Sequence, residues 1–170
     1  VLQRWPPWWW WRGREGDIFA ALLKRWTCIM LISLMVRRDA LEGVKGFDES
    51  LYGSDDLDII LRLAKIVSFG RIPRALASWR WHAGSGSRQE AIYPDQLAAL
   101  RKMKEIWPEQ SQVLDDNIKD AHLAYSWHLS SQGRERESYL QCLAAWNLRP
   151  RDPIAASAYL WSWIRQQFQA

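Results

Sequence analysis

The clearest hydrophobic pattern in the sequence follows a group of acidic residues at positions 55 to 58. Apolar side chains recur there at steps of three and four residues: Leu57, Ile60, Leu61, Ala64 and Val67. Steps of that length place the side chains on one face of an α-helix. Ser54 or Asp55 can cap the free N–H groups at its start, and acidic side chains favour the positive end of the helix dipole. The pattern therefore predicts a helix that begins at residue 54 or 55.

Helical spacing returns near residue 94 and continues to the end of the chain. The apolar positions fall in four groups: Leu97, Leu100, Met103 and Trp107; Ile118, Leu123 and Trp127; Tyr139, Leu143 and Trp146; Tyr159, Leu160 and Trp163. Gly133 and Pro150 interrupt the pattern, as residues that end helices do. Residues 121 to 150 weakly resemble one tetratricopeptide repeat, whose unit is about 34 residues. With a single copy, we favour an ordinary helical hairpin.

Three segments in the first half have the pattern of β-strands. Residues 29 to 36 are a continuous, partly β-branched apolar run, which is typical of a strand buried on both faces. Residues 69 to 73 and 75 to 82 indicate two short strands, the second with alternating polar and apolar positions. Short helices are expected after Asp17 and from Arg38. The fold class predicted from these elements is α+β and rich in helix.

The composition supports a folded chain, long enough for one domain of ordinary size or for one small domain plus an appendage. The length is 170 residues, with 48% hydrophobic and 25% charged side chains, which is ordinary for a globular protein. We predict a mixed domain over residues 1 to 90 and an α-helical extension over residues 91 to 170. Cys28 and Cys142 lie far apart inside apolar stretches, which is typical of core residues in a reducing compartment rather than of a disulfide framework.

The basic and aromatic residues near the N-terminus suggest ligands but do not select one. The net charge of +4 arises within residues 1 to 40, where the basic side chains form no dense run. A solvated basic face is therefore favoured over a nucleic-acid site. Four consecutive Trp residues at positions 8 to 11 follow two prolines. With Arg12 and Arg14 they can stack on bases, and they can equally pack on sugar rings or cover a core.

No targeting or membrane-spanning signal is present in the sequence. Its longest apolar run, residues 26 to 36, is about half of the ~20 residues that a membrane-spanning helix needs. No charged, apolar and small-residue series marks a secretion signal. We expect a cytoplasmic protein, with peripheral association at the inner face of the membrane as an alternative. Because the chain begins at Val1 without a Met, we also expect a truncated N-terminus.

A series of short motifs between residues 37 and 88 resembles a known family. In order they are Arg37-Arg38-Asp39-Ala40-Leu41, Gly46-Phe47-Asp48-Glu49, Asp55-Asp56-Leu57-Asp58, Leu61-Arg62-Leu63-Ala64, Ile72-Pro73 and Trp79-Arg80-Trp81-His82. The series is similar to the second half of the family 2 glycosyltransferases, which have the GT-A fold. The resemblance implies a partial GT-A-like α/β sandwich in residues 1 to 90, followed by the helical tail. The sequence departs from the family at Lys45, where a Gly is usual, and at Asp55, where Glu is usual.

The resemblance implies roles for particular residues. Asp56 would be the base that takes the proton of the acceptor hydroxyl, and Asp55 would hold acceptor hydroxyls. His82 would be a ligand of a divalent metal, Mn or Mg, beside the diphosphate, with Trp79 and Arg80 near the substrate or its phosphate. The implied partners are a nucleotide-sugar donor and a glycan or lipid-linked acceptor. The implied reaction is inverting transfer of the sugar.

Each of these roles has a simpler structural alternative. Asp55 and Asp56 can be helix-capping acids, and Asp48 and Glu49 are expected to fix a turn. A lone histidine such as His82 is more often a core or surface residue than a ligand.

The triplet formed by residues 56 to 58 spells the D-x-D signature of the family. It opens a helix, however, and positions two apart on a helix diverge by about 200°, so they do not clamp one ion. We therefore expect the nucleotide-binding half, with its D-x-D partner for the metal, to lie outside this sequence. A chain of this kind would be inactive by itself.

A second hypothesis belongs to a different functional class. Residues 94 to 170, together with the Trp cluster, would form a helical module that binds a protein partner without catalysis. Nucleic-acid binding ranks third and is not expected.

Overall fold

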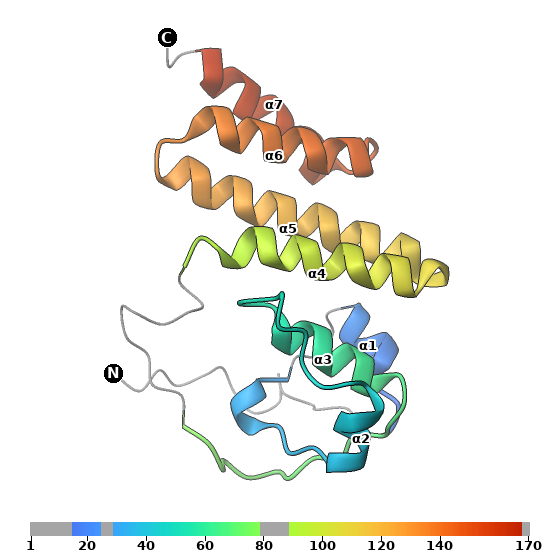
Figure 1. Ribbon diagram of the computed structural model, residues 1–170. Helices are drawn as coiled ribbons and strands as arrows, with labels where there is room; N and C mark the ends of the chain where they lie inside the picture. Colours follow the sequence, from blue (N-terminus) through green and yellow to red (C-terminus); the bar gives the residue numbers. More distant parts are fainter. Residues whose placement is uncertain (1–14, 25–28, 79–88, 168–170) are drawn as a thin grey trace. The chain divides into compact units, whose positions relative to one another are not determined.

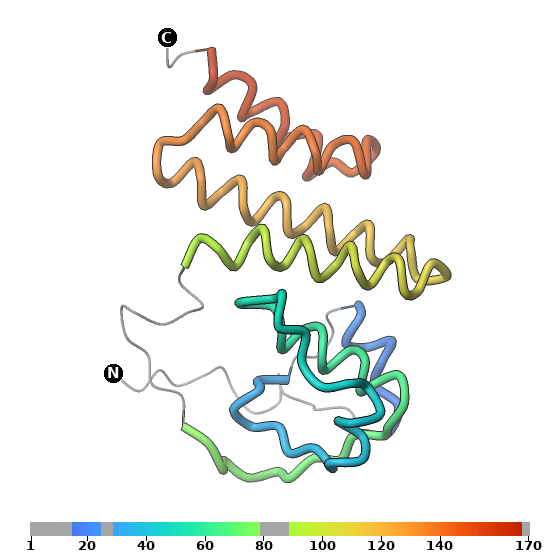
Figure 2. Tube along the Cα trace, in the orientation of Figure 1, coloured from blue at the N-terminus to red at the C-terminus, as the bar shows by residue number. Residues whose placement is uncertain are grey.

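The computed structural model describes residues 15 to 24, 29 to 78 and 89 to 167 (Figures 1 and 2). The chain divides into two compact units, Val1–Gln89 and Glu90–Ala170. Of the described residues, 66% are helical and none lies in a strand or sheet. The prediction of an α+β, GT-A-like sandwich was therefore wrong, and the part of the chain that the structure describes is all-α.

The first unit is built from short helices. They are α1 (Phe19–Leu23), the 3₁₀ turn η2 (Leu31–Ser33), α2 (Arg38–Gly43) and α3 (Asp55–Ala64). The core of this unit forms where α1 packs against α3, with the buried side chains Ile18, Leu22, Leu23, Ile59, Leu61 and Leu63. Helix α3 begins where the hydrophobic pattern predicted, and Ile60, Leu61 and Ala64 of the predicted stripe are buried. Ile59 and Leu63, which the stripe did not include, are buried as well, and Val67 lies beyond the end of the helix. Ser54 is its N-cap residue, but the predicted capping hydrogen bond from this side chain is absent.

The expected buried strand at residues 29 to 36 was wrong. The segment contains the turn η2 instead, with Ile32 exposed and Met35 94% exposed. A strand buried on both faces needs neighbouring strands to bond its backbone groups. No described segment offers them, so the Ser33 N–H bonds to the Met30 carbonyl oxygen at 2.9 Å within the turn.

The expected strand at residues 69 to 73 was also wrong. Phe69 makes one antiparallel bridge to Gly16. The Gly16 N–H donates to the Phe69 carbonyl oxygen at 2.7 Å, and the Phe69 N–H donates to the Gly16 carbonyl oxygen at 2.9 Å. Gly16 accommodates this contact at a φ of 82°, which glycine adopts at little cost. The following residues up to 78 are irregular and exposed, and the rest of the third expected strand lies outside the described residues. One isolated bridge does not make a sheet.

The loop between α2 and α3 takes an unusual backbone conformation. Lys45 has a φ of 62° and Gly46 a φ of 69°, both in the left-handed region. Lys45 is the position at which the glycosyltransferase pattern usually has Gly, and the conformation is one that glycine adopts more easily than lysine. The Arg62 side chain fixes this loop from α3 by donating to the carbonyl oxygens of Val44 and, at 2.9 Å, Gly46.

The second unit consists of longer helices, each of which packs on the one before it. They are α4 (Ile92–Ile106), the 3₁₀ turn η4 (Pro108–Gln110), α5 (Ser111–Ser131), α6 (Glu135–Leu148) and α7 (Pro153–Gln167). Figure 1 shows α5 and α6 side by side, with α7 beyond α6. The core runs through the four α-helices and includes Leu100, Met103, Leu114, Leu129, Cys142 and Ala155. The prediction of helix from residue 94 to the end is confirmed for the described residues.

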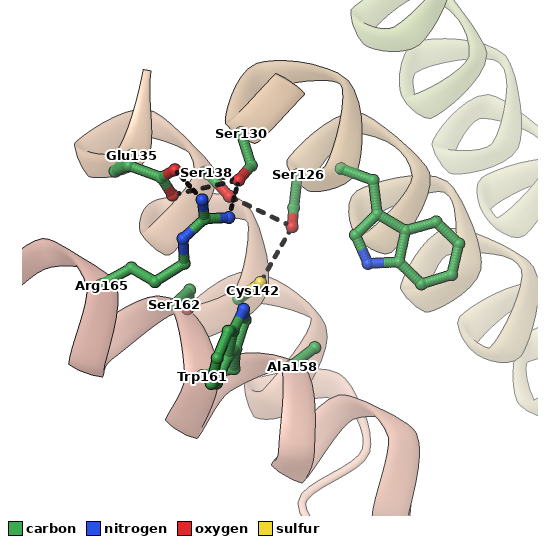
Figure 3. A pocket seen from close by; sticks show the side chains of 10 residues that line it. Ser126, Ser130, Glu135, Ser138, Cys142, Ala158, Trp161, Ser162 and Arg165 are labelled. Carbon is green, nitrogen blue, oxygen red and sulfur yellow. Dashed lines mark hydrogen bonds and ion pairs between the residues drawn. The ribbon is translucent and has the colours of Figure 1, made fainter. Parts of the chain in front are cut away.

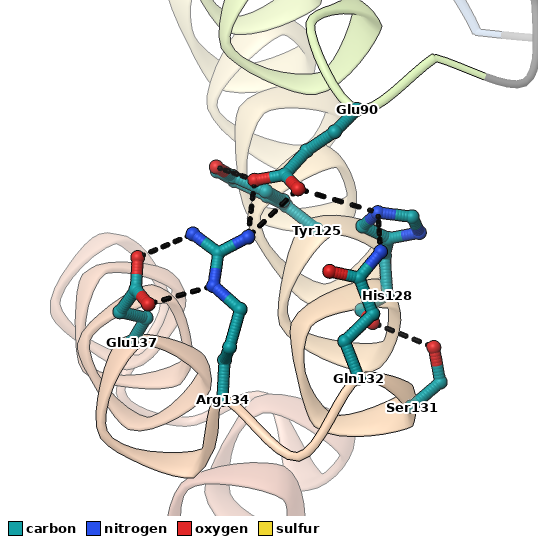
Figure 4. Close-up of polar contacts among 7 residues, drawn as sticks. All are labelled: Glu90, Tyr125, His128, Ser131, Gln132, Arg134 and Glu137. Carbon is teal, nitrogen blue, oxygen red and sulfur yellow. Dashed lines mark hydrogen bonds and ion pairs between the residues drawn. The ribbon is translucent and has the colours of Figure 1, made fainter.

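A polar cluster ties the start of α4 to the turn between α5 and α6 (Figure 4). The Arg134 guanidinium donates to both carboxylate oxygens of Glu90 at 2.7 Å and, through its other edge, to Glu137 at 2.6 Å. Tyr125 donates its hydroxyl to Glu90 at 3.0 Å, and His128 lies 3.8 Å away from that carboxylate. The hydrogen bond from Arg134 lowers the pKa of Glu90. These contacts fix the entry into the helical unit.

Candidate functional site

Asp56 is the predicted catalytic residue whose surroundings the structure describes best. It lies in the first turn of α3, and its carboxyl group is half-buried. The backbone N–H of Leu57 donates to Asp56 Oδ1 at 2.7 Å. Burial raises the pKa of Asp56, and the neighbouring charge of Asp55 raises it further. This carboxylate therefore holds a proton more readily than a solvated aspartate does.

The two carboxylates at the start of α3 differ from the third one in the same turn. Asp58 is completely buried and forms a salt bridge with Arg62, which donates to Asp58 Oδ2 from its Nε at 2.8 Å. Within the described residues, neither Asp55 nor Asp56 has an ion-pair partner. Asp58 thus has a structural task, whereas Asp55 and Asp56 keep oxygen lone pairs for a ligand.

The apparent D-x-D triplet does not act as a single carboxylate clamp. Asp58 faces Arg62 and Asp56 bonds the helix backbone, so the two side chains serve different contacts. In the residues that the structure describes, no group of three or more His, Cys, Asp and Glu side chains is placed to hold a metal ion. The helical setting of the triplet is the one that its sequence pattern predicted.

Asp48 occupies the structural role expected from its motif. Its Oδ1 accepts from the Ser50 N–H at 3.0 Å and from the Ser50 hydroxyl at 2.6 Å. Both contacts close the turn that leads into the residues before α3. Asp48 therefore fixes the turn that precedes α3.

The other predicted site residues cannot be added to this geometry. Trp79, Arg80 and His82 lie outside the described residues. The site that can be built is the acidic pair Asp55 and Asp56, placed on α3 and supported by the Arg62 contacts to the preceding loop. Its chemical capacity is to accept a proton and to bind hydroxyl groups.

A second candidate site was not predicted from the sequence. It is a pocket of about 210 Å³ between α5, α6 and α7, lined by serines, two tryptophans and an ion pair (Figure 3). The residues come from three helices, so no contiguous motif marks them. The spacing of Ser126 and Ser130, four apart on one helix face, is the local signal in the sequence.

Comparisons with protein-family models, with curated proteins and with solved structures found no match to this chain. Of the helices in the described ranges, none combines the length and apolar character needed to cross a membrane.

Proposed function

We propose that the chain takes part in glycosyl transfer from a nucleotide sugar to an acceptor hydroxyl, with Asp56 as the general base. One observation carries the proposal: a half-buried carboxyl group with a raised pKa and free oxygen lone pairs lies at the residue that the motif series singles out. A general base works best when its pKa approaches the working pH. The proposal depends on the motif order and on this environment.

The reaction divides between the two carboxylates. The Asp56 carboxylate takes the proton of the acceptor hydroxyl while that oxygen forms a bond to the anomeric carbon of the donor. The bond between this carbon and the nucleoside diphosphate breaks, and the diphosphate leaves with the bonding electrons. Asp55, one position earlier in the same turn, accepts hydrogen bonds from the other acceptor hydroxyls and orients the attacking one. Attack opposite the leaving group inverts the anomeric centre.

The positive charge for the departing diphosphate is a further part of the proposal. By the resemblance, His82 would hold a divalent cation, Mn or Mg, which neutralises charge on the leaving group when bound. Trp79 and Arg80 would line the same substrate. The described residues supply no further ligand set for such an ion.

The test compares Asp56→Asn with the wild-type product of the gene that encodes this chain. Activity is measured as release of nucleoside diphosphate from UDP-, GDP- and dTDP-sugars, with free hexoses as acceptors. Loss of a general base lowers kcat by about 10²- to 10⁴-fold. The matched control is Asp39→Asn, since Asp39 lies in the first turn of α2 but is exposed and paired with Arg37. Equal rates for Asp56→Asn and the wild type would remove Asp56 from the mechanism.

A second candidate function is a non-catalytic interaction module formed by α4 to α7. The observation in its favour is that α7 exposes large apolar side chains, among them Leu160 and Trp163, which lie three positions apart on one side of the helix. Exposed apolar surface on the last helix of a stack is typical of a protein contact. Affinity capture from cells that express the gene, with Leu160→Asp compared with the surface control Arg151→Asp, tests this function. Capture of the same proteins by both variants would contradict it.

A further inference from the structure

The pocket between α5, α6 and α7 has two large aromatic side chains at its surface. Trp127 on α5 is 64% exposed and Trp161 on α7 is 63% exposed, and both line the pocket. An indole that is mostly in water contributes little to the core of its own unit. Two of them beside one pocket offer flat apolar faces for a ligand.

The floor of the pocket is polar but uncharged. Ser126 and Ser138 are buried, and the Ser138 hydroxyl donates to Ser126 Oγ at 3.4 Å. Ser126 Oγ lies 3.0 Å from the Cys142 sulfur, which completes a chain of hydrogen bonds across α5 and α6. The floor is therefore held in place by hydrogen bonds among its own side chains.

One end of the pocket carries two charges that neutralise each other. Figure 3 shows Arg165 reaching from α7 toward Glu135 and Ser130. Its Nη1 donates to Ser130 Oγ at 2.8 Å, and its Nη2 lies 3.4 Å from Glu135 Oε1. Glu135 is 2% exposed and also accepts from the Ser130 hydroxyl, so its carboxylate is covered. What reaches the opening is the half-exposed Arg165, whose remaining N–H groups are directional donors.

The size and charge of the pocket restrict its ligand. A cavity of about 150 Å³ holds one benzene ring, so a volume of about 210 Å³ suits one six-membered ring with small substituents. A cationic ligand would be repelled by the Arg165 guanidinium, and it could not reach the Glu135 carboxylate because that group is covered. An anionic ligand would meet a guanidinium that is already paired. Both charges are disfavoured, and a neutral ring with polar substituents fits best.

We infer that this pocket binds a neutral pyranose unit of a glycan. A pyranose has an apolar face of C–H groups that stacks on the indoles of Trp127 and Trp161, and hydroxyl groups that accept from Arg165 and from the indole N–H groups. Hydroxyls can donate and accept, so they match a rim with more donors than acceptors. The inference is independent of the glycosyl transfer proposed at Asp56, because every residue of this pocket belongs to α5, α6 or α7.

The experiment measures binding of methyl β-D-glucopyranoside, methyl β-D-galactopyranoside and N-acetylglucosamine to the full chain. Isothermal titration gives the affinity, and ¹H–¹⁵N spectra of the indole N–H groups identify the tryptophans that respond. We expect saturable binding by at least one of the three sugars, in the millimolar range that suits a single stacked ring. We also expect shifts of the Trp127 and Trp161 indole signals, which are assigned by their absence from the two Ala variants.

Substitutions separate the pocket from the rest of the surface. Trp127→Ala and Trp161→Ala should each weaken binding about tenfold, because loss of an aromatic contact of roughly 1.4 kcal/mol corresponds to that factor. The matched control is Trp163→Ala, which removes an exposed indole from the same helix outside the pocket. Its affinity should stay within twofold of wild type. Circular dichroism spectra that coincide for all three variants establish that each is folded.

Three results would overturn the inference. The first is the absence of saturable binding by any of the three sugars. The second is binding that Trp163→Ala weakens as much as Trp161→Ala does. The third is tighter binding of choline or of a proline-rich peptide, with displacement of the sugar and shifts of the same two indole signals. That result would assign the pocket to a cation or to a peptide.

Discussion

The two units of the chain achieve order by different physical means. The second unit, Glu90–Ala170, packs four long helices into one continuous core, so each helix is stabilised along its length by its neighbours. The first unit has short helices and long connections, and its loop before α3 is fixed by polar contacts from Arg62. The candidate catalytic pair therefore lies on the unit with less apolar packing. Such regions are where sites that need mobility and unpaired charge are usually found.

The largest expected effect tests the polar support of the first unit. Asp58→Ala leaves the Arg62 guanidinium without its partner in a buried setting, and breaking a buried pair costs about 3–5 kcal/mol. Amide hydrogen exchange should show loss of protection in α3, with α4 to α7 unchanged. The control Asp39→Ala removes an exposed pair and should leave protection as it is. Equal loss of protection in both units would contradict their independence.

The second prediction tests the apolar core of the second unit. Leu114 is completely buried in α5, and Leu114→Ala creates a cavity that costs about 2–5 kcal/mol. Urea unfolding monitored by far-ultraviolet circular dichroism should show the helical transition at lower denaturant. Leu140→Ala, on the exposed side of α6, should stay within about 0.5 kcal/mol of wild type. A Leu140→Ala variant as unstable as Leu114→Ala would mean that α6 packs differently.

The third prediction concerns the left-handed loop before α3. Gly46→Ala places a Cβ at a φ of 69°, which costs roughly 1–2 kcal/mol, although no atom lies within 4 Å of that Cβ. Lys45→Gly relieves the same kind of strain at the preceding residue and should not destabilise the unit. Hydrogen exchange of α3 amides measures both. A stabilised Gly46→Ala variant would show that the loop does not have this conformation.

The fourth prediction uses a carboxylate of the second unit whose pKa is lowered. The hydrogen bond from Lys119 Nζ to Asp152, at 2.7 Å, lowers the pKa of Asp152. A lowered folded-state pKa adds stability above the unfolded pKa of about 3.9, and this stability disappears as pH falls through the folded value. Asp152→Asn should therefore reduce the melting temperature at pH 7 and have progressively less effect below pH of about 4. The Asn side chain can still accept from the N–H groups of Ile154 and Ala155, which Asp152 caps at 2.9 and 3.0 Å.

The smallest expected effect is a gain in stability, and it concerns Asp56 in the candidate site. Because burial raises the pKa of Asp56, its ionised form destabilises the folded state above the unfolded pKa. Asp56→Asn should raise the melting temperature slightly at pH 7, and the gain should vanish as pH falls below about 4, where both states are protonated. Stability gained together with activity lost is the result expected of a catalytic base. A loss of stability at pH 7 would place Asp56 among the structural residues with Asp58.

Sequence reasoning succeeded where a helix carries a long, regular pattern. The apolar stripe after Asp55 predicted α3, and the spacing from residue 94 predicted the helices of the second unit. It failed at residues 29 to 36, because a continuous apolar run fits a strand, a buried helix or an irregular segment equally well. What decides among these is whether neighbouring strands are present, and the described residues provide none.

The sequence also predicted part of the candidate site at α3 but not all of it. The sequence indicated Asp55 and Asp56 through motif order, and it gave the helical setting in which Asp58 diverges from Asp56. The sequence did not show that Asp58 has a structural role while Asp55 and Asp56 are available to a ligand, because all three are acidic residues in one helical turn. Burial of Asp58 against Arg62, and the partial burial of Asp56, depend on which face of α3 meets the core.

By itself the sequence determined the local elements that repeat a helical period over several turns, since that information lies in neighbouring residues. It also supplied the motif series on which the proposed chemistry rests. Only the tertiary structure brought together Trp127, Glu135 and Trp161 around one pocket, because their side chains come from three separate helices. The pocket and the burial that raises the pKa of Asp56 depend on contacts between separate segments, and such contacts exist only after the helices have packed.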